Sequence, residues 1–434
     1  MPWPPGPHRD RWGASVGRRE PRRFPRGRGH LMGHRVLIFV QHLRGIGHLQ
    51  RAATLARALA ADGIRVDLVS GGMPVPEIGL SGVTLHQLPA LRSPDDSYTR
   101  LVDAQGRDAT PALNASRRKA LVDIFQATRP DAVMVEMFPF GRSQIKAEMV
   151  ALVEAARAAV PRPLVISSVR DIIAAKREAS RYDEMADQVA AWFDAVLVHG
   201  DPAVIAFEES FPAARRISQW IHYTGYVLSG PEVTPAPAPD SGPREVLVSA
   251  GGGAFGAKLM KAAMAARASV IMEATIAGAP WRLLTGLNIP TRQAAELERL
   301  AGDGIVIERM RRDFRNLLAH ARVSVSLCGY NTAIEVIAAR VPAVMVPFGS
   351  GRQNEQRRRA AALARIGLAE QVSETDLDGH SLAAAINAAV ARGQGRGSEI
   401  PGIDMSGAET TRHLVGKWLA RRTAETGAAL GAPA

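Results

Sequence analysis

Cysteine is almost missing from this sequence, in which Cys328 is the only one among 434 residues. A single cysteine cannot form an internal disulfide, and it cannot build the thiolate clusters that hold structural zinc or iron–sulfur centres. Metal chemistry based on cysteine is therefore excluded, and the natural compartment for such a chain is the reducing cytoplasm.

Long apolar runs are missing as well. No stretch approaches the ~18 consecutive apolar residues of a membrane-spanning helix, and the longest runs, such as Val36 to Val40, have the length of a buried strand. We therefore expect a cytoplasmic protein that is either soluble or peripheral on the inner face of the membrane.

The sequence is basic, with a formal net charge of +12, but most of this charge lies at one end. Residues 1–35 contain nine arginines against Asp10 and Glu20, a net charge of +7, which leaves +5 for the other 399 residues. Residues 1–33 are rich in Pro, Gly and Arg and lack the apolar core of a signal peptide, so we interpret them as a disordered basic tail. Such an arm binds phosphates or anionic lipid without reading sequence, and we expect no specific nucleic-acid partner.

From His34 onward, short apolar runs alternate with helical patterns. Val36 to Val40 is followed by a helical stretch, 49–62, and by a second apolar run, 66–70. Strand, helix and strand in this order form a βαβ unit, which implies a parallel sheet with right-handed crossovers. Further strands are predicted at 133–136, 164–168 and 195–199. We expect residues 34–229 to form a doubly wound α/β domain.

A proline-rich segment, 230–243, divides the chain, because its repeated prolines feed neither a helix nor a central strand. The alternation then resumes, with strands predicted at 245–249, 281–285, 304–307, 323–326 and 343–346. The predicted fold class is α/β, with two Rossmann-like, doubly wound parallel-sheet domains, 34–229 and 244–407, that face a cleft. A helix over 408–422 and a frayed tail over 423–434 end the sequence.

The first predicted strand leads into the segment QHLRGIGH, Gln41 to His48, directly before a helix. Open α/β sheets bind ligands outside the carboxyl ends of their strands, and Gly45 and Gly47 let backbone amides approach a ligand there. The segment is not a G-x-G-x-x-G fingerprint, so a dinucleotide site fits poorly. Histidine titrates near neutrality, which makes His48 a candidate general base; the alternative is that it only packs the start of the helix.

A second glycine-rich turn, Ser249 to Gly256, joins a strand to a helix after the linker. The main-chain donors of Gly251, Gly252 and Gly253 could wrap a diphosphate. Because the Gly-Lys-Ser/Thr ending of a P-loop is missing, nucleotide hydrolysis is not expected. The alternative is a tight turn that uses glycine only for its backbone conformation.

The most informative stretch begins with a third loop between a strand and a helix, Gly329 to Thr332. Thr332 offers a hydroxyl and a main-chain amide to phosphate. Glu335 lies one turn into the helix, where its carboxylate can accept two hydrogen bonds from a ribose diol. A strand bracketed by prolines and the polar pair Glu355-Gln356 follow.

Together these loops resemble the MurG-like glycosyltransferases of family 28, especially the bacterial branch described as predicted glycosyltransferases. The resemblance covers about 35–392 and is strongest between 304 and 367. It implies the GT-B fold, with the N-terminal domain on the acceptor side and the C-terminal domain holding a nucleotide-sugar. It also implies donor-binding roles for Gly251, Gly252, Gly253, Arg309, Arg311, Gly329, Asn331, Thr332, Glu335, Glu355 and Gln356, and an acceptor or diphosphate loop at Gly45 and Gly47. The first loop has fewer glycines than the family pattern and Glu355 replaces a glutamine, so neither the sugar nor the acceptor is named.

Two further acids lie at the carboxyl ends of predicted strands. Glu136 ends the strand 133–136, and Asp171 follows the strand 164–168. Either could serve as the catalytic base or orient an acceptor; the alternative for each is a helix cap or an ion pair with a neighbouring arginine. Asp376 and Asp378 match an Asp-x-Asp metal pattern, but their position just before a predicted helix indicates a cap instead.

We therefore expect an inverting transferase that moves a hexose or N-acetylhexosamine from a nucleotide-sugar to the hydroxyl of a lipid-linked or small-molecule acceptor, and the resemblance implies that the nucleotide-sugar is a UDP-sugar. No metal or other cofactor is expected, since helix N-termini and main-chain amides would neutralise the leaving diphosphate. Two alternatives stay open. One is a UDP-sugar 2-epimerase, which needs no acceptor, and the other is a non-catalytic nucleotide-sugar-binding protein whose basic arm binds nucleic acid.

Overall fold

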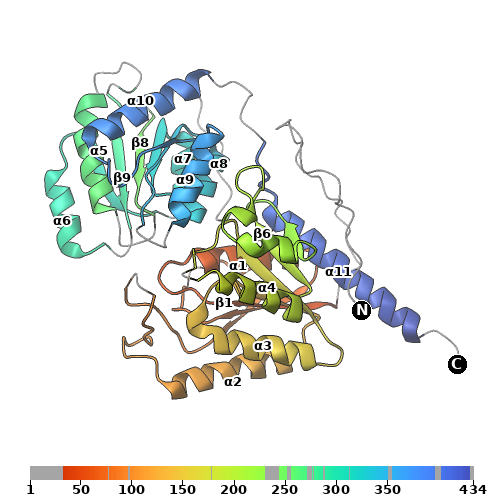
Figure 1. Ribbon diagram of the computed structural model, residues 1–434. Helices are drawn as coiled ribbons and strands as arrows, with labels where there is room; N and C mark the ends of the chain where they lie inside the picture. Colours follow the sequence, from red (N-terminus) through yellow and green to blue (C-terminus); the bar gives the residue numbers. More distant parts are fainter. Residues whose placement is uncertain are drawn as a thin grey trace. The chain divides into compact units, whose positions relative to one another are not determined.

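The computed structural model of the chain describes residues 33–430 except 77, 96–97, 177, 230–243, 252–255, 271–275, 277, 287–288, 312, 350–353 and 396–401. It divides into two compact units (Figure 1): unit 1 is Met1–Val227 with Gly402–Ala434, and unit 2 is Leu228–Pro401. Nearly all of the predicted basic tail, the predicted linker 230–243, and Gly252 and Gly253 lie outside the described residues.

Unit 1 is built on a parallel sheet that is seven-stranded in its described part, with the order β3-β2-β1-β4-β5-β6-β7. The strands are β1 (Arg35–Val40), β2 (Arg65–Ser70), β3 (Val83–Gln87), β4 (Ala132–Glu136), β5 (Leu164–Arg170), β6 (Ala195–His199) and β7 (Ile221–Tyr223). The chain runs outward from β1 to β3 and then returns to place β4 on the other side of β1. This reversal makes the carboxyl ends of β1 and β4 the topological switch point, where open α/β sheets bind ligands.

Alternate residues of each central strand pack against helices on opposite faces, as the two-residue period of a strand requires. Leu37 and Phe39 of β1 share a core with α2 (Pro111–Thr128), α3 (Lys146–Ala158) and α4 (Ser180–Trp192). Val36 and Ile38 share the other core with α1 (Gly47–Ala60). Figure 1 shows α2 and α3 side by side on the first of these faces.

The C-terminal helix α11 (Gly407–Leu430) packs on the same face of unit 1 as α1. Val415, Trp418 and Leu419 join the core that contains α1, and Arg412 donates to both carboxylate oxygens of Asp62 at 2.5 and 2.6 Å. The structure differs here from the sequence-based boundaries. The helix continues to Leu430 instead of ending at 422, and 402–407 group with unit 1 instead of the C-terminal domain.

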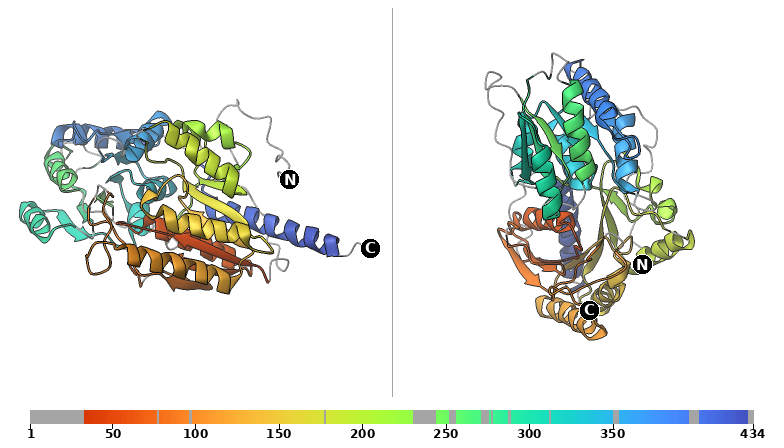
Figure 2. Two further views of the ribbon diagram at one scale, coloured as in Figure 1. Left: turned by 60° about the horizontal axis from the view of Figure 1, so that its bottom comes forward. Right: turned by 90° about the vertical axis from the view of Figure 1, so that its left-hand side faces the viewer.

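The described part of unit 2 contains a six-stranded parallel sheet with the order β10-β9-β8-β11-β12-β13. Its strands are β8 (Val246–Ser249), β9 (Trp281–Thr285), β10 (Ile305–Arg309), β11 (Val323–Ser326), β12 (Ala343–Met345) and β13 (Glu370–Gln371). Its helices are α5 (Ala257–Val270), α6 (Thr291–Leu300), α7 (Phe314–His320), α8 (Tyr330–Ala339), α9 (Glu355–Arg365) and α10 (Gly379–Gly395). Helices α5 and α10 lie together over one face, as Figure 2 shows, and share a core with Val246 and Val248. Here the chain reverses between β8 and β11, the strands that carry the second and third predicted loops.

The predicted fold class, two Rossmann-like α/β domains with parallel sheets, is confirmed. The predicted capping role of Asp378 is also confirmed, because its Oδ1 accepts a hydrogen bond from the backbone of Ser381 at 2.8 Å in the first turn of α10. None of the helices in the described part of the chain combines the length and apolar character that a membrane span requires.

Arg117 of α2 fastens the carboxyl edge of the first sheet. Its side chain is fully buried and forms a two-point ion pair with Glu148 of α3 at 2.8 and 2.9 Å. The same guanidinium donates to Gln41 Oε1 after β1 at 2.8 Å, to the carbonyl of Gly71 after β2 at 3.0 Å, and to the carbonyl of Pro89 after β3. One fully hydrogen-bonded cation therefore holds three strand ends in place.

We predict that Arg117→Ala lowers the free energy of unfolding of unit 1 by about 3–5 kcal/mol, because it leaves Glu148 as a buried, unpaired charge. Its neighbour Arg118 is exposed, so Arg118→Ala should change the same quantity by less than about 0.5 kcal/mol. Urea unfolding followed by circular dichroism measures both. Equal effects of the two substitutions would contradict the prediction.

Candidate active site

The loop after β1 and the last residue of β4 place two predicted catalytic residues in contact. His48 lies in the first turn of α1, and its Nδ1 is 3.0 and 3.1 Å from the two carboxylate oxygens of Glu136. The side chain of Glu136 is 1% exposed, whereas that of His48 is 18% exposed. No group in the described part of the chain lies within hydrogen-bond distance of the other ring nitrogen, Nε2. An Nδ1–H held by Glu136 leaves the Nε2 lone pair available to a substrate proton.

Positive charge beside Glu136 keeps that carboxylate ionised. Burial acts to raise the pKa of Glu136, but His48, Arg51 and Arg142 outweigh it and lower the pKa to about 2. Burial lowers the pKa of His48 to about 3. Arg142 and Arg51 also lower it, whereas Glu136 acts to raise it. His48 is therefore neutral at neutral pH, and Arg51, ion-paired with Glu136, supplies the balancing charge together with Arg142.

A buried hydrogen-bond chain supports the neighbouring strand. Ser168 of β5 is the register partner of Glu136, and its Oγ lies 2.9 Å from Nε2 of His199. Nδ1 of His199 lies 2.9 Å from the hydroxyl of Thr224, which itself donates to the carbonyl of Gly225. These bonds fix the tautomer of His199 with its proton on Nδ1, and burial lowers its pKa to about 3. Because its polar groups are all hydrogen-bonded, we interpret this hydrogen-bond chain as a structural support for the strand end that carries Glu136.

Asp171, Gly45 and Gly47 are the other residues predicted for unit 1. Asp171 is buried, and its Oδ1 accepts from the backbone of Ile172 at 2.8 Å, so it serves its own turn rather than contacting His48. Gly45 is exposed with open space where a Cβ would be, and Gly47 begins α1. The structure thus brings Glu136, and not Asp171, to His48.

Arg51 and Arg142 are two site residues that were not predicted from the sequence. Arg51 lies three residues after His48, which puts it on the same face of α1, and this spacing was the signal that could have found it. Arg142 lies in the loop after β4 and adopts a left-handed conformation with φ of 63°. No sequence pattern predicts this conformation for an arginine.

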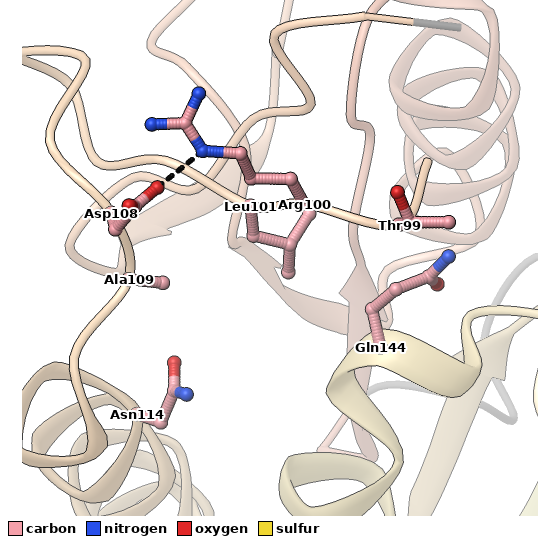
Figure 3. Close-up of a pocket in the computed structure, with 7 residues that line it drawn as sticks. All are labelled: Thr99, Arg100, Leu101, Asp108, Ala109, Asn114 and Gln144. Atoms are coloured by element: carbon pink, nitrogen blue, oxygen red, sulfur yellow. Dashed lines mark hydrogen bonds and ion pairs between the residues drawn. The ribbon is translucent and has the colours of Figure 1, made fainter. Parts of the chain in front are cut away.

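A cavity of about 430 Å³ lies in unit 1 beside the start of α2 (Figure 3). It is lined by Thr99, Arg100, Leu101, Asp108, Ala109, Asn114 and Gln144. Arg100 and Asp108 form an ion pair at 2.5 Å across part of this lining. Most of the lining side chains are polar, which suits a ligand rich in hydroxyl or amide groups.

In unit 2 the second and third predicted loops are adjacent. Gly251 follows β8 with φ of +66°, a conformation that favours glycine, and its amide donates to Ser249 Oγ at 3.2 Å. A Cβ built on Gly251 would lie 3.7 Å from the hydroxyl of Thr332 in the first turn of α8. Gly329 is the N-cap of α8, and Asn331 and Thr332 are half-buried there. A glycine turn and a helix N-terminus side by side form a surface of amide and hydroxyl donors suited to phosphate.

Glu335 lies on α8 one turn beyond Thr332 and is half-buried. Burial raises its pKa to about 7, and Arg315 of α7 opposes the shift. No described residue forms a hydrogen bond or ion pair with its carboxylate. This carboxylate has the unsatisfied acceptor capacity that a ribose diol would fill.

Gln356 has a role that the sequence did not indicate. Its Oε1 accepts from the backbone of Cys328 at 3.0 Å and from the backbone of Phe348 at 3.1 Å. Arg359, which the sequence analysis missed, is buried, donates to the carbonyl of Cys328 at 2.9 Å and lies 5.6 Å above the Tyr330 ring. Gln356 thus joins the loops that follow β11 and β12, and Arg359 adds a second bond to the first of them. A direct sugar contact from Gln356 could use only its amide nitrogen, and Glu355, the first residue of α9, stays a prediction.

The structure does not join Arg309 or Arg311 to Glu335. Arg309 is exposed at the end of the edge strand β10, and Arg311 forms a two-point ion pair with Asp313 at 2.7 and 2.8 Å.

A smaller cavity, of about 230 Å³, opens at the carboxyl edge of the sheet between the start of α5 and the loop that follows β12. Its lining includes Leu327, Phe348 and Lys258. Within the described residues no group of three His, Cys, Asp or Glu side chains is placed to hold a metal ion.

Comparisons with known proteins agree with this geometry. Residues 248–398 match the glycosyltransferase family 28 C-terminal domain, a segment that contains Gly251, Thr332 and Glu335. Two relatives carry the name UDP-N-acetylglucosamine–N-acetylmuramyl-(pentapeptide) pyrophosphoryl-undecaprenol N-acetylglucosamine transferase. The one from Solidesulfovibrio magneticus is 31% identical over 157 residues, 34% of this chain and 41% of that protein. The one from Thiobacillus denitrificans is 27% identical over 207 residues, 46% of this chain and 51% of that protein. The chain thus spans about half or less of the length of these relatives.

Solved structures extend the similarity in fold to nearly the whole chain. MurG of Acinetobacter baumannii superposes with a TM-score of 0.52 at 16% identity, over 88% of this chain and 99% of that one. The glycosyltransferase VinC in complex with dTDP gives a TM-score of 0.57 at 16% identity, over 89% of this chain and 100% of that one. At such identities the likeness shows the fold alone. Residues 248–398 therefore form a glycosyltransferase family 28 C-terminal domain, and the chain resembles the MurG-like glycosyltransferases of the GT-B fold.

Proposed function

We propose that this protein transfers a hexose or N-acetylhexosamine from a UDP-sugar to a hydroxyl of an acceptor. The observation that carries the proposal is the contact between His48 and Glu136 at the switch point of unit 1. A neutral imidazole oriented by a buried carboxylate is suited to take a proton from a hydroxyl, which a protein that only binds nucleotide-sugars does not need.

Unit 2 is the donor half in this proposal. The amide and hydroxyl donors of Gly251, Gly329 and Thr332 take the diphosphate, and the carboxylate of Glu335 accepts the two hydroxyls of the ribose. The family 28 match over 248–398 supports this assignment, and the names of the relatives support a UDP-sugar. Gln356, on α9, accepts a hydrogen bond from the backbone of Cys328 and so supports the third loop.

The proposed reaction is a single displacement. Nε2 of His48 takes the proton of the acceptor hydroxyl while its oxygen forms a bond to the anomeric carbon of the sugar. The bond from that carbon to the diphosphate oxygen breaks, the electron pair leaves with UDP, and attack from the opposite face inverts the anomeric configuration. Helix N-terminal amides stabilise the leaving diphosphate, so the proposal requires no metal or other cofactor.

The acceptor in this proposal is a hydroxyl-bearing molecule, lipid-linked or small, that is used in the cytoplasm. The names of the relatives, which include a pyrophosphoryl-undecaprenol acceptor, support the lipid-linked form. A protein that uses such an acceptor works as a peripheral protein on the inner face of the membrane.

The first prediction concerns the donor. Titration of the full chain with UDP, GDP and dTDP in EDTA should show micromolar binding of UDP, and Glu335→Gln should weaken it about 10- to 100-fold by removing the acceptor of both ribose hydroxyls. Glu298, an exposed residue of α6, provides the control Glu298→Gln, which should bind as the wild type does. Absence of binding for all three nucleotides would refute the donor assignment.

The second prediction concerns the base. His48→Gln and Glu136→Gln should each lower kcat by about 10²- to 10⁴-fold while the affinity for UDP changes less than about twofold. Transfer of label from UDP-N-acetylglucosamine to a cellular lipid extract measures the rate, and His380→Gln, at an exposed histidine of α10, is the control. An unchanged kcat in His48→Gln would remove the base role, and label converted to another UDP-sugar without any acceptor would favour an epimerase.

The third prediction follows from the pKa of Glu335, which burial raises to about 7. Because the ionised form accepts the ribose hydroxyls, UDP affinity should rise between pH 6 and pH 8, by about tenfold per pH unit at most, and level off above the pKa. Because the pKa of Glu335 in the folded state lies above its ordinary 4.5, protonation of this carboxyl favours folding at low pH. This contribution to the free energy of unfolding is lost as the pH rises through 7. At pH 8, Glu335→Gln should thus stabilise unit 2 by about 1–3 kcal/mol. A pH profile of UDP binding that is the same in Glu335→Gln and wild type would contradict this role.

A further inference from the structure

Arg51 is a buried arginine of α1 that has no direct part in the proposed reaction. Its side chain is 2% exposed, and its Nη2 donates to Oε1 of Glu136, the carboxylate at the end of β4. The same nitrogen lies 3.4 Å from Nδ1 of His48, three residues earlier on α1. The guanidinium, the carboxylate and the imidazole therefore form one compact cluster.

The carboxylate of Glu136 determines which nitrogen of His48 carries the proton. Nδ1 lies 3.0 and 3.1 Å from the two carboxylate oxygens, within hydrogen-bond distance of both. An ionised carboxylate can only accept a hydrogen bond, so Nδ1 is the donor and the lone pair lies on Nε2. A protonated carboxyl would donate to Nδ1 instead, and the imidazole proton would then lie on Nε2. The tautomer of the candidate base thus depends on the ionisation of Glu136.

Arg51 is the residue best placed to keep Glu136 ionised. Burial acts to raise the pKa of this carboxyl, whereas His48, Arg51 and Arg142 lower it, with a net result of about 2. His48 is neutral at neutral pH and contributes a hydrogen bond rather than a permanent charge. Arg51 contributes a permanent charge in direct contact with the carboxylate.

The other charged and titratable groups around the pair do not hold the carboxylate. Arg142, in the loop after β4, acts electrostatically on both His48 and Glu136, and within the described residues it has no hydrogen bond to either. His199, at the end of β6, is neutral, because burial lowers its pKa to about 3, and both of its ring nitrogens lie within hydrogen-bond distance of neighbouring hydroxyls. In the part of the chain that the structure describes, the cation that hydrogen-bonds Glu136 is therefore Arg51.

We propose that Arg51 is a positioning residue, whose guanidinium holds Glu136 as an anion in one orientation and so selects the His48 tautomer with its lone pair on Nε2. The inference rests on the proposed transferase function and deepens it, because it explains how the base is kept in the state that takes the proton of a hydroxyl. No proton has to move within the His48–Glu136 pair before the reaction, since Glu136 stays ionised and Nδ1 stays protonated. Arg51 acts through Glu136 and touches neither substrate.

The tautomer of His48 can be measured without any substrate. In the full chain labelled with ¹⁵N-histidine, two-bond ¹H–¹⁵N correlations distinguish the two neutral tautomers from the imidazolium, and His48→Gln identifies the signal. The wild type should show the proton on Nδ1 from about pH 4 to about pH 8. Because Arg51→Gln removes the cation that opposes protonation, the His48–Glu136 pair should take up a proton about 1–3 pH units higher, with a midpoint between about pH 4 and pH 6.

The same substitution should change activity in a pH-dependent way. Compared with the wild type at the same pH, Arg51→Gln should lower kcat about tenfold at pH 8, where Glu136 is ionised but less firmly held, and by a further factor of about three or more at pH 5. The affinity for UDP should change less than about twofold, because the candidate donor residues lie in unit 2. Transfer of label and titration with UDP measure the two quantities.

Two further variants separate the charge of Arg51 from its bulk. Arg51→Lys keeps the charge and should retain the wild-type tautomer of His48 over the same pH range. Arg118→Gln removes an arginine from an exposed position on α2 and should match the wild type in both the spectra and the rates. If Arg51→Gln does not fold, Arg51→Lys still decides, because a purely structural need for the guanidinium predicts a loss of kcat that is equal at every pH and a lower Tm.

Two results would overturn the inference. One is a His48 signal in Arg51→Gln that keeps the proton on Nδ1 down to pH 4, as in the wild type. The other is an Arg51→Lys variant that loses this tautomer at the same pH as Arg51→Gln. Failure of the proposed transferase function is distinguishable, because it appears as absent UDP binding or absent transfer in the wild type, whereas the spectra of His48 require neither donor nor acceptor.

Discussion

The carboxylate of Glu136 is the charge on which the geometry of unit 1 at its switch point depends. It is almost fully buried, and a buried carboxylate persists in its ionised form only when cations and donors compensate the lost hydration. Arg51 supplies an ion pair, Arg142 supplies a more distant charge, and His48 supplies a hydrogen bond. Because the arginines already provide the charge, His48 stays neutral, and a neutral imidazole is the form that can accept a proton.

The strand ends around this pair are held from two sides. Arg117 ties Gln41 to the loops after β2 and β3, and the chain from Ser168 through His199 to Thr224 satisfies the buried polar groups of β5 and β6. In unit 2, Gln356 and Arg359 do the same for the backbone of Cys328. In both units, buried side chains of neighbouring elements hydrogen-bond the backbone close to the strand ends that carry the candidate site residues.

The alternation of apolar runs and helical stretches was sufficient to predict two parallel sheets, because a βαβ rhythm allows few other solutions. His48, Glu136, Glu335 and the glycine loops were chosen as candidates because open α/β sheets bind ligands at their strand ends. Which of these residues lie in contact could not be predicted from the sequence. Glu136 and Asp171 both end strands, and only the order of the sheet, which puts β4 beside β1, selects Glu136 as the partner of His48.

Features that depend on contacts between distant parts of the chain could not be predicted either, because the sequence does not show which elements pack together. The left-handed conformation of Arg142 has no local signature, since that conformation is unusual for arginine. The return of α11 to unit 1 depends on Trp418 and Leu419 filling a core that includes residues of α1 and β1, more than 300 residues earlier in the chain. The oxygen of Gln356 accepts from two backbone amides that belong to different loops, and only the packed sheet brings those amides together.

Two arginines of unit 1 show how a fully hydrogen-bonded charge differs from an unsatisfied one. Arg117 is fully buried with every side of its guanidinium hydrogen-bonded, so it has nothing left to offer a ligand. Arg142 carries the same group with a buried Nε that no described residue satisfies, and Glu335 in unit 2 is the corresponding case for a carboxylate. Each unsatisfied group lowers the stability of the free protein, because burial has removed its water without supplying a hydrogen-bond partner. A ligand with the complementary group would supply that partner. Binding then gains specificity for a ligand with the complementary group, because the protein has met the desolvation cost before the ligand arrives.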